Sequence, residues 1–130
     1  MDGQKLTVAR RIQRRTEYKR IYGKGERIHG HFMTVFILPT DKSASRLGVA
    51  ATRKLGTAVQ RNRAKRLARE LFRGHKNTSI YDVVVVPRRE MLNAPFSKLK
   101  ADYCSLLRRR REKNSLGAVS DGKSTRAQIN

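Results

Sequence analysis

The densest group of chemically capable side chains lies in residues 52–70 (TRKLGTAVQRNRAKRLARE), where seven basic residues accompany a single acid. Guanidinium groups bind phosphate oxygens through paired hydrogen bonds, and lysine adds a point charge. On a helix, Asn62, Lys65, Arg66 and Arg69 would share one face. Because acidic partners are missing, the cations do not balance each other within the helix. The pattern favours a phosphate-binding helix over a solvated charged face.

The whole chain is strongly basic. Its 130 residues include 31 Lys and Arg against 10 Asp and Glu, a formal net charge of +21. This charge argues against an ordinary neutral enzyme and indicates nucleic acid, with a basic membrane-surface protein as the alternative. No apolar stretch is long enough to predict a membrane span, and arginines interrupt any N-terminal signal core. A single cysteine, Cys104, excludes an intramolecular disulfide and a zinc site made of several thiolates.

A second candidate site is aromatic. Tyr18, Ile21 and Tyr22 recur at helical spacing, which predicts a short helix over residues 17–23 that Thr16 would cap. Spacing alone favours packing of these side chains in a core. The alternative is a stacking surface for the bases of a single strand, where each stacked base contributes about 1–3 kcal/mol.

The elements that position these residues follow from periodicity. Apolar residues recur every three or four positions over residues 58–73, which predicts a helix with Thr57 as N-cap and Gly74 as its end. Residues 32–38 and 46–52 are predicted to form an antiparallel hairpin. Four consecutive valines in residues 81–86 indicate a strand covered on both faces.

Ser97 is predicted to cap the last helix, which runs to about Arg111 with Leu99, Tyr103 and Leu106 facing inward. The order helix, strand, strand, helix, strand, helix predicts an α/β (α+β) sandwich. The predicted organisation has three parts: a basic lead-in over residues 1–13, an RNA-binding domain over 14–112, and a disordered polar tail over 113–130.

Other polar residues predict no catalytic or metal site. Arg108–Arg111 point in four directions on a helix, so we expect a diffuse phosphate contact or a solvated helix end there. Three histidines lack the further ligands that a metal needs, and the aspartates are scattered along the chain. These residues are His29, His31, His75, Asp41, Asp82 and Asp102.

Residues 52–70 resemble the motif of the protein subunit of bacterial ribonuclease P. The resemblance covers roughly residues 10–112 and is much more specific than basic charge alone. The residues that carry it are Lys54, Gly56, Ala58, Val59, Arg61-Asn62-Arg63, Lys65-Arg66 and Arg69-Glu70.

The resemblance implies a two-layer sandwich with a small mixed sheet, about three helices and a left-handed βαβ crossover. It also implies a cytoplasmic ribonucleoprotein that removes the 5′ leader from precursor tRNA. In that assembly the RNA cleaves with magnesium ions that it mainly binds itself, the protein alone is inactive, and no organic cofactor, membrane or obligate protein partner takes part.

The resemblance assigns two sets of binding residues and no catalytic residue. The set expected to bind the catalytic RNA is Arg61, Asn62, Arg63, Lys65, Arg66 and Arg69. The set expected to bind the leader is Tyr18, Tyr22, Phe36 and Lys54. The family commonly has phenylalanine at the positions of Tyr18 and Tyr22. A tyrosine ring still stacks there, and its hydroxyl adds a polar contact.

Three alternatives belong to other functional classes. A structural ribosomal protein that binds ribosomal RNA would have the same size, charge and basic tail. A protein-only nuclease would need an acid–base or metal constellation that the sequence does not show. A DNA-binding protein is disfavoured because no helix-turn-helix motif is present and an aromatic cleft suits single strands better.

Overall fold

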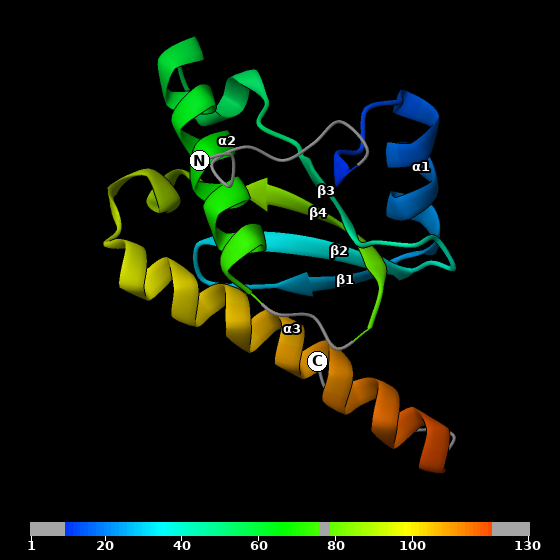
Figure 1. Ribbon diagram of the computed structural model, residues 1–130. Helices are drawn as coiled ribbons and strands as arrows, with labels where there is room; N and C mark the ends of the chain where they lie inside the picture. Colours follow the sequence, from blue (N-terminus) through cyan, green and yellow to red (C-terminus); the bar gives the residue numbers. More distant parts are fainter. Residues whose placement is uncertain (1–9, 76–78, 121–130) are drawn as a thin grey trace.

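The computed structural model describes residues 10–75 and 79–120, and side chains in residues 10–75 and 79–110. It forms an α+β domain in which helices surround a four-stranded sheet (Figure 1). The elements in chain order are α1 (Arg15–Lys24), β1 (Glu26–His29), β2 (Met33–Pro39), β3 (Arg46–Val49), η3 (Arg53–Leu55), α2 (Ala58–Gly74), β4 (Tyr81–Pro87), η4 (Arg89–Asn93) and α3 (Phe96–Ser120).

The sheet is mixed, as predicted, with strand order β1-β2-β4-β3. β2 pairs antiparallel with both β1 and β4, whereas β3 runs parallel to β4. The valine-rich β4 is central, and Val83, Val84 and Val85 are fully buried, which confirms a strand covered on both faces. The crossover from β3 through α2 to β4 is left-handed (Figure 1), against the usual right-handed preference.

One prediction about the strands is wrong, and one strand was not predicted. Residues 32–38 and 46–52 do not form a hairpin, because β4 inserts between β2 and β3. The most apolar strand takes the position where both of its edges are paired and both faces are covered. The edge strand β1 was missed because its sequence, Glu26–His29, has one buried apolar residue, Ile28.

The alternation of side chains along the strands gives the sheet two different faces. Val35, Ile37, Val83 and Val85 lie in the main core with residues of α2 and α3, where the predicted inward residues Leu99, Tyr103 and Leu106 are confirmed. Val84 lies in a smaller cluster on the opposite face, with Phe36 and Val86 of the sheet and Ile21 and Tyr18 of α1. Helix α1 therefore adds a partial third layer to the predicted two.

Of the predicted helix N-caps, that of α2 is confirmed and that of α1 is wrong. Thr57 caps α2 as predicted: its hydroxyl accepts a hydrogen bond from the Gln60 N–H (3.2 Å), and the Gln60 side chain accepts one from the Thr57 N–H (2.8 Å). Gly56 adopts a φ of 151°, and an added Cβ would meet the Gln60 side chain. The predicted Thr16 cap is wrong, because α1 begins at Arg15 with Arg14 as N-cap.

Helix α3 begins at Phe96, so the predicted Ser97 cap is wrong, and the helix extends to Ser120, past the predicted end near Arg111. The segment predicted to be a disordered tail, residues 113–130, therefore lies in part on this helix. Its remainder, residues 121–130, lies outside the described residues, as do residues 1–9 of the predicted lead-in.

Candidate RNA-binding surface

Helix α2 packs closely on the sheet and turns its cations outward. Ala64 and Ala68 are fully buried on its inner side, and such small side chains allow a close approach. Asn62 and Arg66 are exposed, and Lys65 and Arg69 are partly buried. The predicted division of this helix into an apolar side and a cationic side is therefore confirmed.

Lys65 and Arg69 lie one helical turn apart and line a cavity of about 210 Å³, here called the basic cavity. Tyr18 of α1 and Gly48 of β3 line it as well, together with Arg11 from the segment before α1. The basic cavity therefore joins the two predicted groups, because a residue of the aromatic set and two residues of the cationic set meet at one hollow.

The basic cavity is short of negative charge. Burial lowers the pKa of Arg69, and the positive charges of Arg11, Arg66 and Arg73 lower it further. Between residues 10 and 110, no carboxylate forms a hydrogen bond or ion pair with Arg66 or Arg69. An anion such as a phosphate would relieve this repulsion, so the electrostatics favour polyanion binding.

The aromatic residues Tyr18, Tyr22 and Phe36 form a continuous cluster beside the basic cavity, whose wall Tyr18 forms; this cluster and its side of the cavity are here called the aromatic groove. The ring centroids of Tyr18 and Tyr22 are 6.2 Å apart, and those of Tyr22 and Phe36 are 4.9 Å apart in an edge-to-face arrangement. Tyr22 is 41% exposed, which is unusual for a large apolar ring in a closed core. The predicted proximity of these three rings is confirmed.

The two tyrosines keep their protons at neutral pH. Burial raises the pKa of Tyr18 and of Tyr22, so both phenols remain neutral donors. The Tyr18 hydroxyl donates to the carbonyl of Ile12 at 3.2 Å, which fixes its ring at the wall of the basic cavity. The Tyr22 ring is left more exposed and presents a surface for stacking.

Of the ten predicted binding residues, only Tyr18, Lys65 and Arg69 line the basic cavity, and the other seven lie outside its wall. Lys54 is exposed on η3, and Arg63 is exposed on α2. Arg61 donates from Nη1 to the carbonyl of Gly56 at 2.9 Å, so part of its guanidinium holds the loop before α2. The structure brings Tyr18, Lys65 and Arg69 together and leaves Lys54, Arg61 and Arg63 on the surrounding surface.

Six residues that line the basic cavity were not predicted as site residues: Arg11, Ile12, Gln13, Leu47, Gly48 and Val49. Arg11 was placed in the lead-in, yet it bridges to Leu47 beside β3, and the Ile12 N–H donates to the Leu47 carbonyl at 2.9 Å. Gly48 was read only as part of a strand. The signal for Arg11 was the apolar Ile12 inside a basic run, because Ile12 is buried in the α1-side cluster.

The described residues contain no group of three or more His, Cys, Asp or Glu side chains placed to hold a metal ion. His29 is engaged otherwise: Arg27 Nε donates to its Nε2, and its Nδ1 faces the Thr34 hydroxyl, each at 3.2 Å. In the described part of the chain, no helix is long and apolar enough to cross a membrane.

A mixed sheet with a left-handed crossover, a cationic crossover helix and an adjacent aromatic groove define a small α+β nucleic-acid-binding protein. Comparison with known proteins identifies a family within this class. The family model described as Ribonuclease P matches residues 6–111.

Curated relatives and solved structures agree with that match. A ribonuclease P protein component of Caldanaerobacter subterraneus is 35% identical over 109 residues, covering 82% of this chain and 90% of that protein. One from Desulfovibrio desulfuricans is 38% identical over 105 residues, covering 76% and 81%. The ribonuclease P protein structure from Thermotoga maritima gives a TM-score of 0.69 at 30% identity, covering 76% of this chain and 96% of that one. The Staphylococcus aureus structure gives 0.68 at 29%, covering 76% and 93%.

The chain belongs to the ribonuclease P protein family. It is a protein subunit of a ribonucleoprotein that acts in tRNA processing, and its partner is RNA. The alternative of a structural ribosomal protein is not supported.

Proposed function

We propose that the chain binds two RNAs through two adjacent surfaces. The cationic side of α2 binds the catalytic RNA of ribonuclease P through Arg61, Asn62, Arg63, Lys65, Arg66 and Arg69. The aromatic groove binds the single-stranded 5′ leader of precursor tRNA through Tyr18, Tyr22 and Phe36, and Lys54 on η3 meets leader phosphates.

The observation that carries this proposal is the juxtaposition of Tyr18 with Lys65 and Arg69 around the basic cavity. A single strand needs stacking platforms for its bases and cations for its backbone. The aromatic groove supplies the first and Lys54 on η3 supplies the second, while Lys65 and Arg69 at the basic cavity hold the catalytic RNA. A strand in the groove would therefore lie directly beside an RNA bound on α2, and the protein would screen the repulsion between two polyanions.

Bond cleavage is assigned to the catalytic RNA. Magnesium ions held mainly by that RNA would activate the attacking water and stabilise the leaving oxygen. The part that we assign to the protein is binding and orientation. Binding of the leader beside the catalytic RNA raises the affinity for precursor over mature tRNA, and it lowers the magnesium concentration that the RNA needs.

The test is 5′-leader cleavage of a precursor tRNA at low magnesium, with protein alone, bacterial ribonuclease P RNA alone, and both together. We expect cleavage only in the mixture, with a gain that falls steeply as salt rises, because phosphate contacts release counterions. Cleavage by rigorously RNA-free protein would overturn the assignment of chemistry to RNA. A folded protein that gives no gain in the mixture would overturn the binding proposal.

A further inference from the structure

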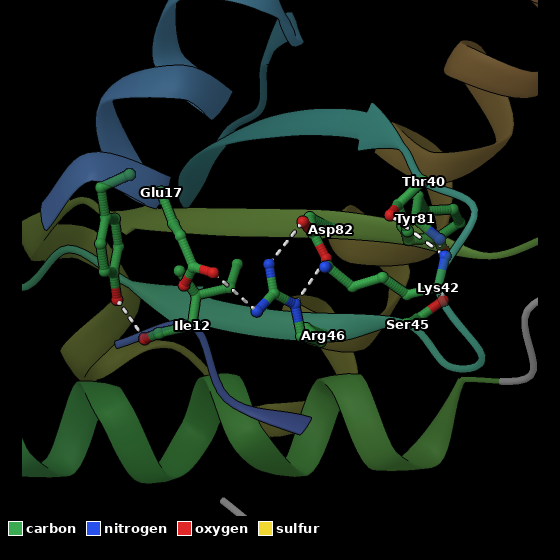
Figure 2. Close-up of polar contacts among 9 residues, drawn as sticks. Ile12, Glu17, Thr40, Lys42, Ser45, Arg46, Tyr81 and Asp82 are labelled. Carbon is green, nitrogen blue, oxygen red and sulfur yellow. Dashed lines mark hydrogen bonds and ion pairs between the residues drawn. The ribbon is translucent and has the colours of Figure 1, made fainter. Parts of the chain in front are cut away.

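Arg46 joins three elements through one guanidinium group. Its Nε and Nη2 donate to the two carboxylate oxygens of Asp82 on β4, at 3.0 and 2.9 Å. Its Nη1 donates to Oε2 of Glu17 on α1, at 3.1 Å. Figure 2 shows the side chain of Arg46 lying between the two acids. The group thus ties α1 to the strand pair β3–β4.

Burial differs along this chain of ion pairs. The Asp82 side chain is 1% exposed, that of Arg46 is 12% exposed, and that of Glu17 is 29% exposed. A buried carboxylate needs its partner, so the Arg46–Asp82 pair belongs to the folded sheet. The contact with Glu17 is nearer solvent, and it is the contact that connects β3 to helix α1.

The same side of β3 also holds the neighbouring aromatic residue. Arg46 and Gly48 are two positions apart and face α1, where they meet the consecutive residues Glu17 and Tyr18. A Cβ added at Gly48 would lie 2.8 Å from the Tyr18 hydroxyl oxygen. The Tyr18 ring therefore lies against β3 at a position where a side chain on residue 48 would collide with it.

We propose that Arg46 is a positioning residue for leader binding: its contact with Glu17 fixes the first turn of α1 on the sheet and thereby sets the width of the aromatic groove. This inference rests on the proposed function of the groove. Arg46 itself does not touch the leader. It acts through Glu17 and so through Tyr18, the next residue along α1.

Loss of the Glu17 side chain is expected to weaken precursor binding, although the loss of its negative charge alone would strengthen it. Replacing Glu17 by alanine removes an acid, which by electrostatics alone would strengthen RNA binding. We expect instead that Glu17→Ala weakens the affinity of the reconstituted holoenzyme for precursor tRNA by about threefold to tenfold, with mature tRNA affinity unchanged. Glu17→Gln keeps an oxygen that can accept from Arg46 and should restore part of the loss.

The matched control is Glu90→Ala, which makes the same change of charge at an exposed glutamate of η4. It should leave precursor and mature tRNA affinities unchanged or raise both together. Arg46→Lys keeps the positive charge but cannot serve both carboxylates, and it should lower precursor affinity as Glu17→Ala does. Thermal melting of each variant identifies those that remain folded, and the binding comparison uses the folded ones.

Tyr18→Ala, measured in parallel, separates the two proposals. If Tyr18→Ala leaves precursor affinity intact, the leader-binding function of the groove is wrong. If Tyr18→Ala lowers it while Glu17→Ala and Arg46→Lys behave like Glu90→Ala, the groove binds the leader and the positioning role of Arg46 is wrong. A positioning role further predicts a raised KM for precursor with kcat unchanged, whereas equal losses for precursor and mature tRNA would contradict it.

Discussion

The two faces of the sheet are formed by the same strands, but they differ in the helices that cover them and in how accessible their side chains are. One face meets α2 and α3, helices of 17 and 25 residues, and its side chains are buried in the main core. The other meets α1, a helix of 10 residues, and leaves Tyr18, Tyr22 and Phe36 partly accessible. The short helix leaves part of an apolar face uncovered, and the exposed ring of Tyr22 lies in that part.

The two faces are also held together differently. The covered face relies mainly on burial of apolar area, although Asp102 of α3 also accepts from the N–H groups of His31 and Phe32. The α1 face adds directional contacts at the rim, because Arg46 pairs with Glu17 and the Tyr18 hydroxyl donates to Ile12. Directional contacts can fix the position of a helix without filling the space beneath it, which a binding groove requires.

The largest expected effect is on stability, at the covered face. Leu99 is fully buried between α3 and the sheet, so Leu99→Ala should lower the free energy of unfolding by about 2–5 kcal/mol. Tyr22→Ala on the open face should cost less than about 1 kcal/mol, since that ring is already partly in water. Urea unfolding of both variants measures the difference, and equal losses would break the distinction between the faces.

Next in size is the cationic side of α2. Arg66→Ala combined with Arg69→Ala should weaken binding of ribonuclease P RNA by about 2–4 kcal/mol. The slope of log affinity against log salt should also become shallower, by the amount that corresponds to the loss of roughly one to two phosphate contacts. Arg88→Ala with Arg89→Ala removes the same charge from exposed positions at η4 and is the control. Affinity measured against salt distinguishes them, and identical slopes for the two variants would refute a specific surface on α2.

Tyr18→Ala should have a smaller and more selective effect. Loss of one stacked base costs about 1–3 kcal/mol, so precursor tRNA should bind less tightly while mature tRNA binds as before. Tyr18→Phe keeps the ring and loses the hydrogen bond to Ile12, and it should retain most of the affinity. Titration of each variant holoenzyme with both tRNAs gives the ratio, and a loss shared equally by both tRNAs would refute the leader assignment.

The smallest expected effect is that of pH on the α1 rim. Burial alone would raise the pKa of Glu17, but the hydrogen bond and charge of Arg46 outweigh it and lower the pKa. A lowered pKa means that the contact stabilises the fold above the pKa of unfolded glutamate and is lost as pH falls through the folded value. Glu17→Gln should therefore cost about 0.2–1 kcal/mol near neutral pH and nothing near pH 2, by urea unfolding. A difference that persists in acid would contradict the ion pair.

Local signals were sufficient for the elements that carry the site. Thr57 and the apolar repeat determined α2, and the valine run determined β4. The family resemblance assigned the cations of α2 and the aromatic residues to two separate binding sets, and only the structure shows that Tyr18, Lys65 and Arg69 line one cavity. These features depend on residues close in sequence, or on a motif that spans only one helix.

Long-range pairing was not available from the sequence. The hairpin prediction failed because nothing local shows that β4 enters between β2 and β3. Asp82 appeared as one of several scattered acids, yet it is the buried partner of Arg46, 36 residues away. Arg11 likewise reached the basic cavity only through its bridge to Leu47. Each depends on a contact between distant segments, which periodicity cannot reveal.

The central claim, that α2 and α1 face different RNAs, is tested most directly by tethered cleavage. After Cys104→Ser, an iron chelate that generates hydroxyl radicals is attached to one new cysteine, at Gly23→Cys on α1 or at exposed Val59→Cys on α2. In the holoenzyme bound to precursor tRNA, the account predicts cuts in the 5′ leader from position 23 and cuts in the catalytic RNA from position 59. Leader cuts from position 59 with none from position 23 would contradict it.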